Sequence, residues 1–485
     1  MISTDILVIG AGVTGTAVAR ELSRYCADVR VAEMGCDVAE GATKANSGIV
    51  HAGYDAVPGT LKARYNVRGA EMYPELCREL GVPYRRAGAL VIGFDEADRK
   101  TLGELMQRGI TNGVKGLRML DRSEALALEP SLNPAVTCAL DVPTSGIVSP
   151  YEMAFALADD AALNGVHFDF DAKVCRLSRG EDGLWHVLSD REEYVCRAIV
   201  NCAGSFGAEL HNMICDEKLQ MIHRRGQYYL LDRANPQPFS RTIFQCPSVM
   251  GKGVLVSPTV HGNLLLGPTA EDIDDPLDTA TTADGLANIL EKATRTWPKL
   301  STRTNITNFS GIRAHLPGDD FIVGPVAGAA GAFEAIGIES PGLSSAPALA
   351  EDLVRKIAEA MHLQKKNEVV PFPHRPKPFN EMSDGEREAA VREDPMNGTV
   401  ICRCEVVTEA EIRWAIRRPV GARTVDGVKR RTRAGMGRCQ GGFCMPRVAA
   451  IIAEETGCSL AEVTKNGGAS RLLSGTVANY LKEGE

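Results

Sequence analysis

The stretch DILVIGAGVTGTAVAREL at residues 5–22 decides the fold of the first part of the chain. The apolar run at its start predicts a buried parallel strand, and a helical pattern follows from about Val13 to Arg24. The turn between them carries the pattern G-x-G-x-x-G, formed by Gly10, Gly12 and Gly15. The first glycine permits a tight turn, the second lets the backbone approach a pyrophosphate, and the third lets helix and strand pack closely. We therefore expect a dinucleotide-binding βαβ unit.

The other strands of this unit are spread along the chain. Residues 28–33 predict a second strand that ends at Glu33, where a carboxylate can accept a hydrogen bond from a ribose hydroxyl. Buried-strand patterns return at 197–204 and 331–340, and a helical pattern follows the second of these. We interpret them as three pieces of one nucleotide-binding domain, separated by long insertions. Within the insertions, short runs with strand-like composition predict an antiparallel sheet, at 88–94, 227–232, 253–259 and 262–269.

The bulk composition limits the classes of protein to consider. At 485 residues the chain is long enough for two or three domains. Its net charge of -8 argues against nucleic-acid binding, which needs a broad basic surface. No apolar run reaches the ~18 residues of a membrane span, and the first ten residues lack the basic region of a secretory signal. Most of the 14 cysteines are scattered singly through apolar stretches, so we expect a reducing compartment and a cytoplasmic protein.

Four further stretches resemble a known family: NSGIVHAGYDAVPGTLKA, AIVNCAG, SGIRAHLPGDDFIVGP and GIESPGLSSAPALA. With the opening motif they are similar to FAD-dependent enzymes of the D-amino-acid-oxidase superfamily, above all to its branch of glycerol-3-phosphate dehydrogenases and L-2-hydroxyglutarate oxidases. The resemblance implies FAD as the cofactor, with its isoalloxazine ring between two domains. The cofactor-binding residues that we expect are Gly10, Gly12, Gly15, Glu33, Thr43, Asn46, Ser47, Gly48, Val174, Ala203, Gly204, Gly342 and Leu343.

Oxidation of a secondary alcohol by a flavin removes a hydroxyl proton while hydride leaves the carbon, so a base near neutral pKa is needed. His51 is the candidate base; the alternative is that it only hydrogen-bonds the flavin or the backbone. Arg313 matches a family arginine that often holds an anionic substrate group, and its planar fork suits a carboxylate or phosphate. The alternative for Arg313 is an ion pair with Asp319 or Asp320. Lys252 is either a second positive contact or a solvated lysine in a turn.

Two tight pairs of cysteines stand near the end of the chain, in ICRCEVV at 401–407 and GRCQGGFC at 437–444. Four thiolates can hold zinc or a [2Fe–2S] cluster, and the C-x-C spacing is unlike the usual zinc knuckle. The surrounding sequence resembles the bacterioferritin-associated-ferredoxin-like [2Fe–2S] module. That resemblance implies four cluster ligands, Cys402, Cys404, Cys439 and Cys444. The basic run at 429–433 is either a solvated face or a patch that balances the cluster or docks an electron acceptor.

These features predict an α/β (α+β overall) protein with a Rossmann-like FAD domain, an inserted antiparallel-sheet substrate domain and a small, mainly helical iron–sulfur domain. The expected FAD-binding domain comprises residues 1–85, 145–215 and 318–365, and the substrate domain 86–144 and 216–317. A linker rich in Pro and charge is expected at 366–398, the [2Fe–2S] domain at 399–460 and a tail at 461–485.

A flavin takes two electrons as one hydride, whereas a [2Fe–2S] cluster carries one at a time. Their fusion predicts a dehydrogenase of a small anionic hydroxy compound, glycerol 3-phosphate first, that passes electrons outward through the cluster. Alternatives are L-2-hydroxyglutarate or another 2-hydroxy acid, an amino acid, or a non-catalytic electron-relay subunit. The expected partners are the substrate and a redox partner subunit or a quinone-linked acceptor, with peripheral membrane association through such a partner, and no nucleic acid.

Overall fold

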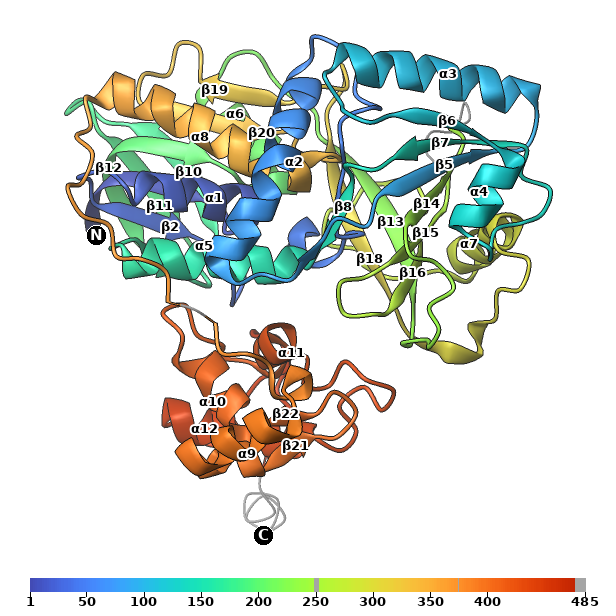
Figure 1. Ribbon diagram of the computed structural model, residues 1–485. Helices are drawn as coiled ribbons and strands as arrows, with labels where there is room; N and C mark the ends of the chain where they lie inside the picture. Colours follow the sequence, from blue (N-terminus) through green and yellow to red (C-terminus); the bar gives the residue numbers. More distant parts are fainter. Residues whose placement is uncertain (248–252, 374, 476–485) are drawn as a thin grey trace.

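The computed structural model describes residues 1–247, 253–373 and 375–475. Figure 1 shows two large α/β parts side by side, with a smaller, mainly helical part beneath them built from the C-terminal quarter of the chain. Among the described residues, no helix is both long and apolar enough to cross a membrane. Lys252, expected as a possible second positive contact, lies outside the described residues.

The first part is built on an eight-stranded sheet that begins with the opening strand of the chain. Its main order is β10 (Val174–Arg179), β11 (Trp185–Ser189), β12 (Glu193–Asn201), β1 (Ile2–Ile9), β2 (Val29–Ala32) and β9 (His167–Asp169). β20 (Ala332–Ile336) pairs with β12 and with β19 (Ile322–Pro325). The pairs β12–β1, β1–β2, β2–β9 and β12–β20 are parallel, as the Rossmann-like prediction requires.

Both faces of this sheet are buried, which explains the unbroken apolar run in β1. Ile6 and Val8 belong to the core formed with α1 (Val13–Leu22), α2 (Leu61–Leu80), α5 (Pro150–Leu163) and α8 (Gly342–Met361). Leu7 and Ile9 point to the opposite face and join a second core with β10–β12 and α6 (Gly207–Ile214). Because side chains alternate along β1, one face of the sheet packs against these four helices and the other packs against β10–β12 and α6.

The second part is a nine-stranded sheet. Its order is β17 (Glu271–Ile273), β13 (Ile222–Leu231), β16 (Leu264–Gly267), β15 (Leu255–Pro258), β14 (Thr242–Gln245), β5 (Ala89–Gly93), β7 (Cys138–Val142) and β6 (Arg118–Asp121), and β18 (Asn305–His315) also pairs with β13. The sheet is antiparallel except for β14 and β5, which run parallel. That pair joins two segments far apart in the sequence, so strand composition could not predict its direction. The associated helices are α3 (Glu96–Thr111), α4 (Arg122–Leu128) and α7 (Ala283–Thr296).

A three-stranded sheet of β3 (Ile49–Val50), β8 (Gly146–Val148) and β4 (Tyr84–Arg85) lies where the two parts meet. Within the described part of the expected linker, the structure has the α-helix α9 (Asp384–Glu393), which starts at a capping box of Ser383 and Glu386. The C-terminal part holds β21 (Val400–Cys402), β22 (Val407–Thr408), α10 (Glu409–Arg417), α11 (Val425–Thr432) and α12 (Met445–Thr456) around its own apolar core. The mainly helical character expected of this part is confirmed.

Candidate functional site

The glycine-rich turn after β1 has the geometry that a dinucleotide needs. Gly10 has φ +102°, and a Cβ on it would lie 2.6 Å from the carbonyl oxygen of Cys202. A Cβ on Gly15 would overlap the carbonyl oxygen of Gly10, so any side chain there would separate α1 from the strand. The N–H of Val13 donates to Thr43 Oγ1 at 2.9 Å, which ties the start of α1 to the 3₁₀ turn Ala42–Lys44.

Glu33 stands at the end of β2, as expected, and is 7% exposed. Its Oε2 accepts from the N–H of Ala11 at 2.6 Å and its Oε1 from that of Gly35 at 2.7 Å. Burial raises the pKa of Glu33, although these two backbone donors oppose the rise. Each carboxylate oxygen keeps a second lone pair that a ribose hydroxyl can use.

A cavity of about 1440 Å³ runs from this turn to the second sheet. It exceeds the ~300–1,000 Å³ of pockets for drug-sized ligands, as a dinucleotide together with a small substrate requires. Its wall includes all but one of the predicted cofactor and catalytic residues: Gly10, Gly12, Glu33, Thr43, Asn46, Ser47, Gly48, His51, Val174, Ala203, Gly204, Arg313, Gly342 and Leu343. Gly15 lies behind the wall, where it lets α1 approach β1. The residues therefore fit FAD in chemistry and in space.

The loop that carries His51 is fixed by hydrogen bonds to its backbone. Its N–H donates to Ser344 Oγ at 2.7 Å, and Asn66 Nδ2 donates to its carbonyl oxygen at 2.6 Å. The imidazole lies against the ring of Phe244, with the ring centroids 5.7 Å apart. Ser344 belongs to α8 and Phe244 to β14, so both large parts hold this histidine in the cavity wall.

Arg313 on β18 belongs to a row of charges across three strands. It lies directly opposite Arg224 on β13, which lies opposite Asp272 on β17. Asp272 accepts from Arg224 Nε at 2.6 Å, and Arg313 Nη2 donates to the carbonyl oxygen of Thr269 at 2.6 Å. Two guanidinium groups on the cavity wall are thus balanced by one carboxylate, which leaves positive charge for an anionic ligand.

The alternative pairing of Arg313 with Asp319 or Asp320 is absent from the described part of the chain. Asp320 accepts from the N–H groups of Leu61 and Lys62, at 2.9 and 3.0 Å. Asp319 accepts from Lys62 Nζ at 2.6 Å.

Tyr228 is a wall residue that sequence reasoning missed. Burial raises the pKa of its hydroxyl, although the nearby Arg313 and Ser47 side chains oppose the rise. Its ring stacks on Phe309 at 4.8 Å. The signal was present in the alternation of β13, because Arg224, Tyr228 and every second residue between them share one face. The sequence did not show which face meets the cavity.

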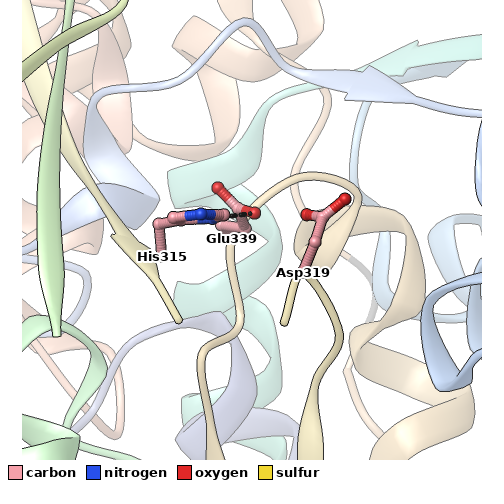
Figure 2. Close-up of side chains that lie close together, drawn as sticks. All are labelled: His315, Asp319 and Glu339. Atoms are coloured by element: carbon pink, nitrogen blue, oxygen red, sulfur yellow. Dashed lines mark hydrogen bonds and ion pairs between the residues drawn. The ribbon is translucent and has the colours of Figure 1, made fainter. Parts of the chain in front are cut away.

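Figure 2 shows a second cluster, in which His315, Asp319 and Glu339 point toward one another. Their ligand atoms all lie within 4.8 Å, a spacing that could hold a metal ion. Lys62 already supplies the cation, because its Nζ donates to Asp319 Oδ1 at 2.6 Å and to Glu339 Oε1 at 2.8 Å. Burial would lower the pKa of Lys62, but Glu339 and Asp319 outweigh it and the pKa is raised. We assign the cluster a structural role, tying α2 to the loop before α8.

The four cysteines of the C-terminal part come together as two pairs of thiols. Cys404 Sγ lies 3.7 Å from Cys439 Sγ, and Cys402 lies beside Cys444. The interaction with the Cys444 thiol lowers the pKa of Cys402 to about 6, although burial opposes it. Backbone N–H groups from Phe443 and its two preceding glycines lower the pKa of Cys439. Such donors stabilise thiolates, so the loop is suited to a thiolate-bound centre. All fourteen cysteines lie among the described residues, and all are free thiols.

The basic run at 429–433 has a role that neither sequence interpretation anticipated. Arg431 has no exposed side-chain surface and grips Asp37 with Nη1 and Nη2, at 2.6 and 2.7 Å. Its guanidinium lies 3.9 Å from the ring centroid of Phe155 on α5. Arg430 pairs with Glu40. These arginines therefore fasten the C-terminal part to the dinucleotide domain, and they are neither solvated nor arranged around the thiols.

Comparisons with known proteins place these features in a family. Residues 5–356 match the family model of FAD dependent oxidoreductases, and residues 400–454 match the BFD-like [2Fe-2S] binding domain. A glycerol 3-phosphate dehydrogenase of Caloramator mitchellensis is 46% identical over 99% of this chain and 100% of its own. An L-2-hydroxyglutarate dehydrogenase of Arabidopsis thaliana is 28% identical over 73% of this chain and 83% of its own.

A solved structure has a similar fold over most of this chain. FAD-bound L-alpha-glycerophosphate oxidase from Mycoplasma pneumoniae superposes with a TM-score of 0.74 at 30% identity, over 78% of this chain and 100% of its own. The cofactors of the chain are therefore FAD and a [2Fe–2S] cluster, and residues 400–454, which match the cluster domain, include all four cysteines. The chain belongs to the FAD-dependent oxidoreductase family and carries a BFD-like [2Fe–2S] domain after its catalytic part.

Proposed function

We propose that this protein is a glycerol-3-phosphate dehydrogenase that oxidises the secondary hydroxyl and sends the electrons out through its [2Fe–2S] cluster. One observation carries the proposal: the similarity to the Caloramator dehydrogenase extends through both the FAD-binding part and the cluster domain. The Mycoplasma oxidase is covered completely yet leaves over a fifth of this chain unmatched. Of these two enzymes of glycerol 3-phosphate, the one whose match includes the cluster domain is named a dehydrogenase, and the shorter one is named an oxidase.

The charged row on the second sheet is the proposed site for the phosphate of the substrate. Arg313 donates one N–H to the carbonyl oxygen of Thr269, and its other N–H groups can donate to two oxygens of the phosphate. Arg224 beside it is already paired with Asp272, so it adds positive potential more than a direct bond. The hydroxyl of Tyr228 lies beside Arg313, where it can contact the same phosphate.

His51 is the proposed base for the hydroxyl proton. Its backbone is held at both the N–H and the carbonyl oxygen, so its ring keeps a defined place in the wall. Bound FAD would supply the acceptor for the hydride that leaves the substrate carbon. Arg313 would hold the phosphate and His51 the hydroxyl, and together they would orient that carbon toward the cofactor.

The position of the loop that carries Cys439 supports electron transfer from the flavin cavity to the cluster. Met436 and Gln440, on either side of Cys439 in the sequence, both belong to the cavity wall. The cluster loop thus contacts the flavin cavity, while Cys404, which pairs with Cys439 of this loop, is exposed. We propose that the acceptor is a redox partner subunit or a quinone-linked protein that approaches this exposed side, with membrane association, where it occurs, through that partner.

An anaerobic substrate panel tests the proposal. Purified holoenzyme is mixed with glycerol 3-phosphate, L-2-hydroxyglutarate, other 2-hydroxy acids or amino acids, and the flavin absorbance is followed. We expect rapid bleaching with glycerol 3-phosphate. Preferential bleaching with L-2-hydroxyglutarate would favour the second candidate, which rests on the HAGYDAVPGTLKA loop and on the plant relative. No bleaching with any compound would contradict a catalytic role and leave the electron-relay function.

A further inference from the structure

The C-terminal domain closes one end of the FAD cavity. The loop that follows Glu33 holds Asp37 and Glu40, and both bind arginines of α11 in the cluster domain. A Cβ on Gly427 would lie 3.0 Å from Asp37 Oδ2, so the helix backbone itself rests on this loop. Because Glu33 marks the ribose position, the cluster domain sits against the adenosine side of the cavity.

Several cationic side chains of this domain reach the cavity wall, but most are neutralised. Arg430 pairs with Glu40, Arg433 Nε with Glu405 at 2.8 Å, and Lys465 Nζ with Asp426 at 2.8 Å. Lys429 also lines the cavity. In contrast to the others, its ammonium group has no hydrogen-bond or ion-pair partner among the residues that the structure describes.

An unpaired ammonium group is costly in this position. Burial lowers the pKa of Lys429, and Lys465 and Arg430 lower it further, against the opposing effect of Asp426. A partly buried cation of this kind is stable when an anion shares its cavity. The glycine-rich turn at the start of α1 and Lys429 line the same cavity, and the anion expected at that turn is the diphosphate of FAD.

We propose that Lys429 is an FAD-binding residue contributed by the [2Fe–2S] domain, and that its ammonium group pairs with the diphosphate of the cofactor. Retention of the flavin then depends on the electron-transfer domain as well as on the glycine-rich turn. The residue lies outside the part that matches the FAD-dependent oxidoreductase family, which ends at residue 356. The proposal concerns FAD binding alone, so its test does not depend on which substrate the enzyme oxidises.

FAD release from the full-length holoenzyme tests this role. Wild type, Lys429→Met and Lys429→Arg are diluted, and the fluorescence of released FAD gives the dissociation constant at low and high salt. A lost charge-assisted hydrogen bond is worth about tenfold or more in affinity. We expect Lys429→Met to bind FAD about tenfold more weakly, with a smaller salt dependence, and Lys429→Arg to bind like wild type.

A matched control is Lys100→Met, which removes an exposed lysine of α3 outside the cavity and should leave FAD affinity unchanged. Iron content and cluster absorbance verify that the C-terminal domain of each variant is intact. Wild-type FAD affinity in Lys429→Met would overturn the proposal. Equal loss in Lys429→Met and Lys429→Arg would overturn it too, because side-chain packing and not charge would then be responsible.

Discussion

Replacement of Asp37 by Asn should loosen the cluster domain from the FAD domain. The side chains of Asp37 and Arg431 are 4% and 0% exposed, and two hydrogen bonds of 2.6 and 2.7 Å join them. Burial opposes ionisation of Asp37, but Arg431 prevails and the pKa of the carboxyl is lowered. Asp37→Asn retains the shape and leaves the guanidinium buried without its counter-charge.

Removing one partner of a buried ion pair costs about 3–5 kcal/mol. Arg431 keeps its contact with Phe155 and a hydrogen bond to the carbonyl oxygen of Val420 at 3.0 Å, so we expect the lower end, about 3 kcal/mol. In urea this corresponds to a midpoint lower by about 1–3 M. The assay follows the visible circular dichroism of the cluster and tryptic cleavage of the linker at 366–398.

The stability that the Asp37–Arg431 pair contributes should fall at acidic pH. Because the pKa of Asp37 is lowered by folding, its contribution is fully present above the unfolded value of about 3.9 and is lost as pH falls below it. The difference between wild type and Asp37→Asn should be constant from about pH 5 to 8 and shrink toward acid.

A double-mutant cycle separates the pair from its surroundings. Arg431→Met in the Asp37→Asn background removes the unpaired charge, so the double variant should be more stable than the sum of the single changes implies. Glu75→Gln, which breaks an exposed pair with Arg78, should have no measurable effect. The reasoning is refuted if Asp37→Asn unfolds like wild type or if the two substitutions are additive.

Three further substitutions examine the catalytic proposals. Arg313→Ala should raise KM for glycerol 3-phosphate about 10- to 100-fold in steady-state assays, since bonds to a charged group are lost; an unchanged KM would exclude phosphate binding there. His51→Asn should slow anaerobic flavin bleaching about 10²- to 10⁴-fold in stopped flow while FAD stays bound, and a normal rate would show that His51 is not the base. Cys404→Ser should abolish cluster absorbance and reduction of one-electron acceptors while substrate still bleaches the flavin; full acceptor activity without the cluster would contradict the electron exit.

Local patterns were sufficient wherever spacing alone sets the geometry. The G-x-G-x-x-G turn, the strand ending at Glu33 and the four cysteines are each encoded by neighbours within a few residues, because backbone sterics and ligand spacing act over short distances. The fold class and both cofactors followed from them and from the family resemblance. The parallel pairing of β5 with β14 did not, since it joins distant segments.

By itself, then, the sequence determined a dinucleotide-binding domain, its FAD and a four-thiol centre near the other end. Only the tertiary structure decided which charged side chains are paired and which are not. Asp37 and Arg431 are 394 residues apart in the chain, and no local pattern relates them. Folding pairs them, neutralises Lys62 with Asp319 and Glu339, and places Arg313 and Lys429 in the cavity wall without a carboxylate partner among the described residues. The physical reason is that a charge becomes structural or functional according to the partner that burial brings to it, and burial is a property of the whole fold.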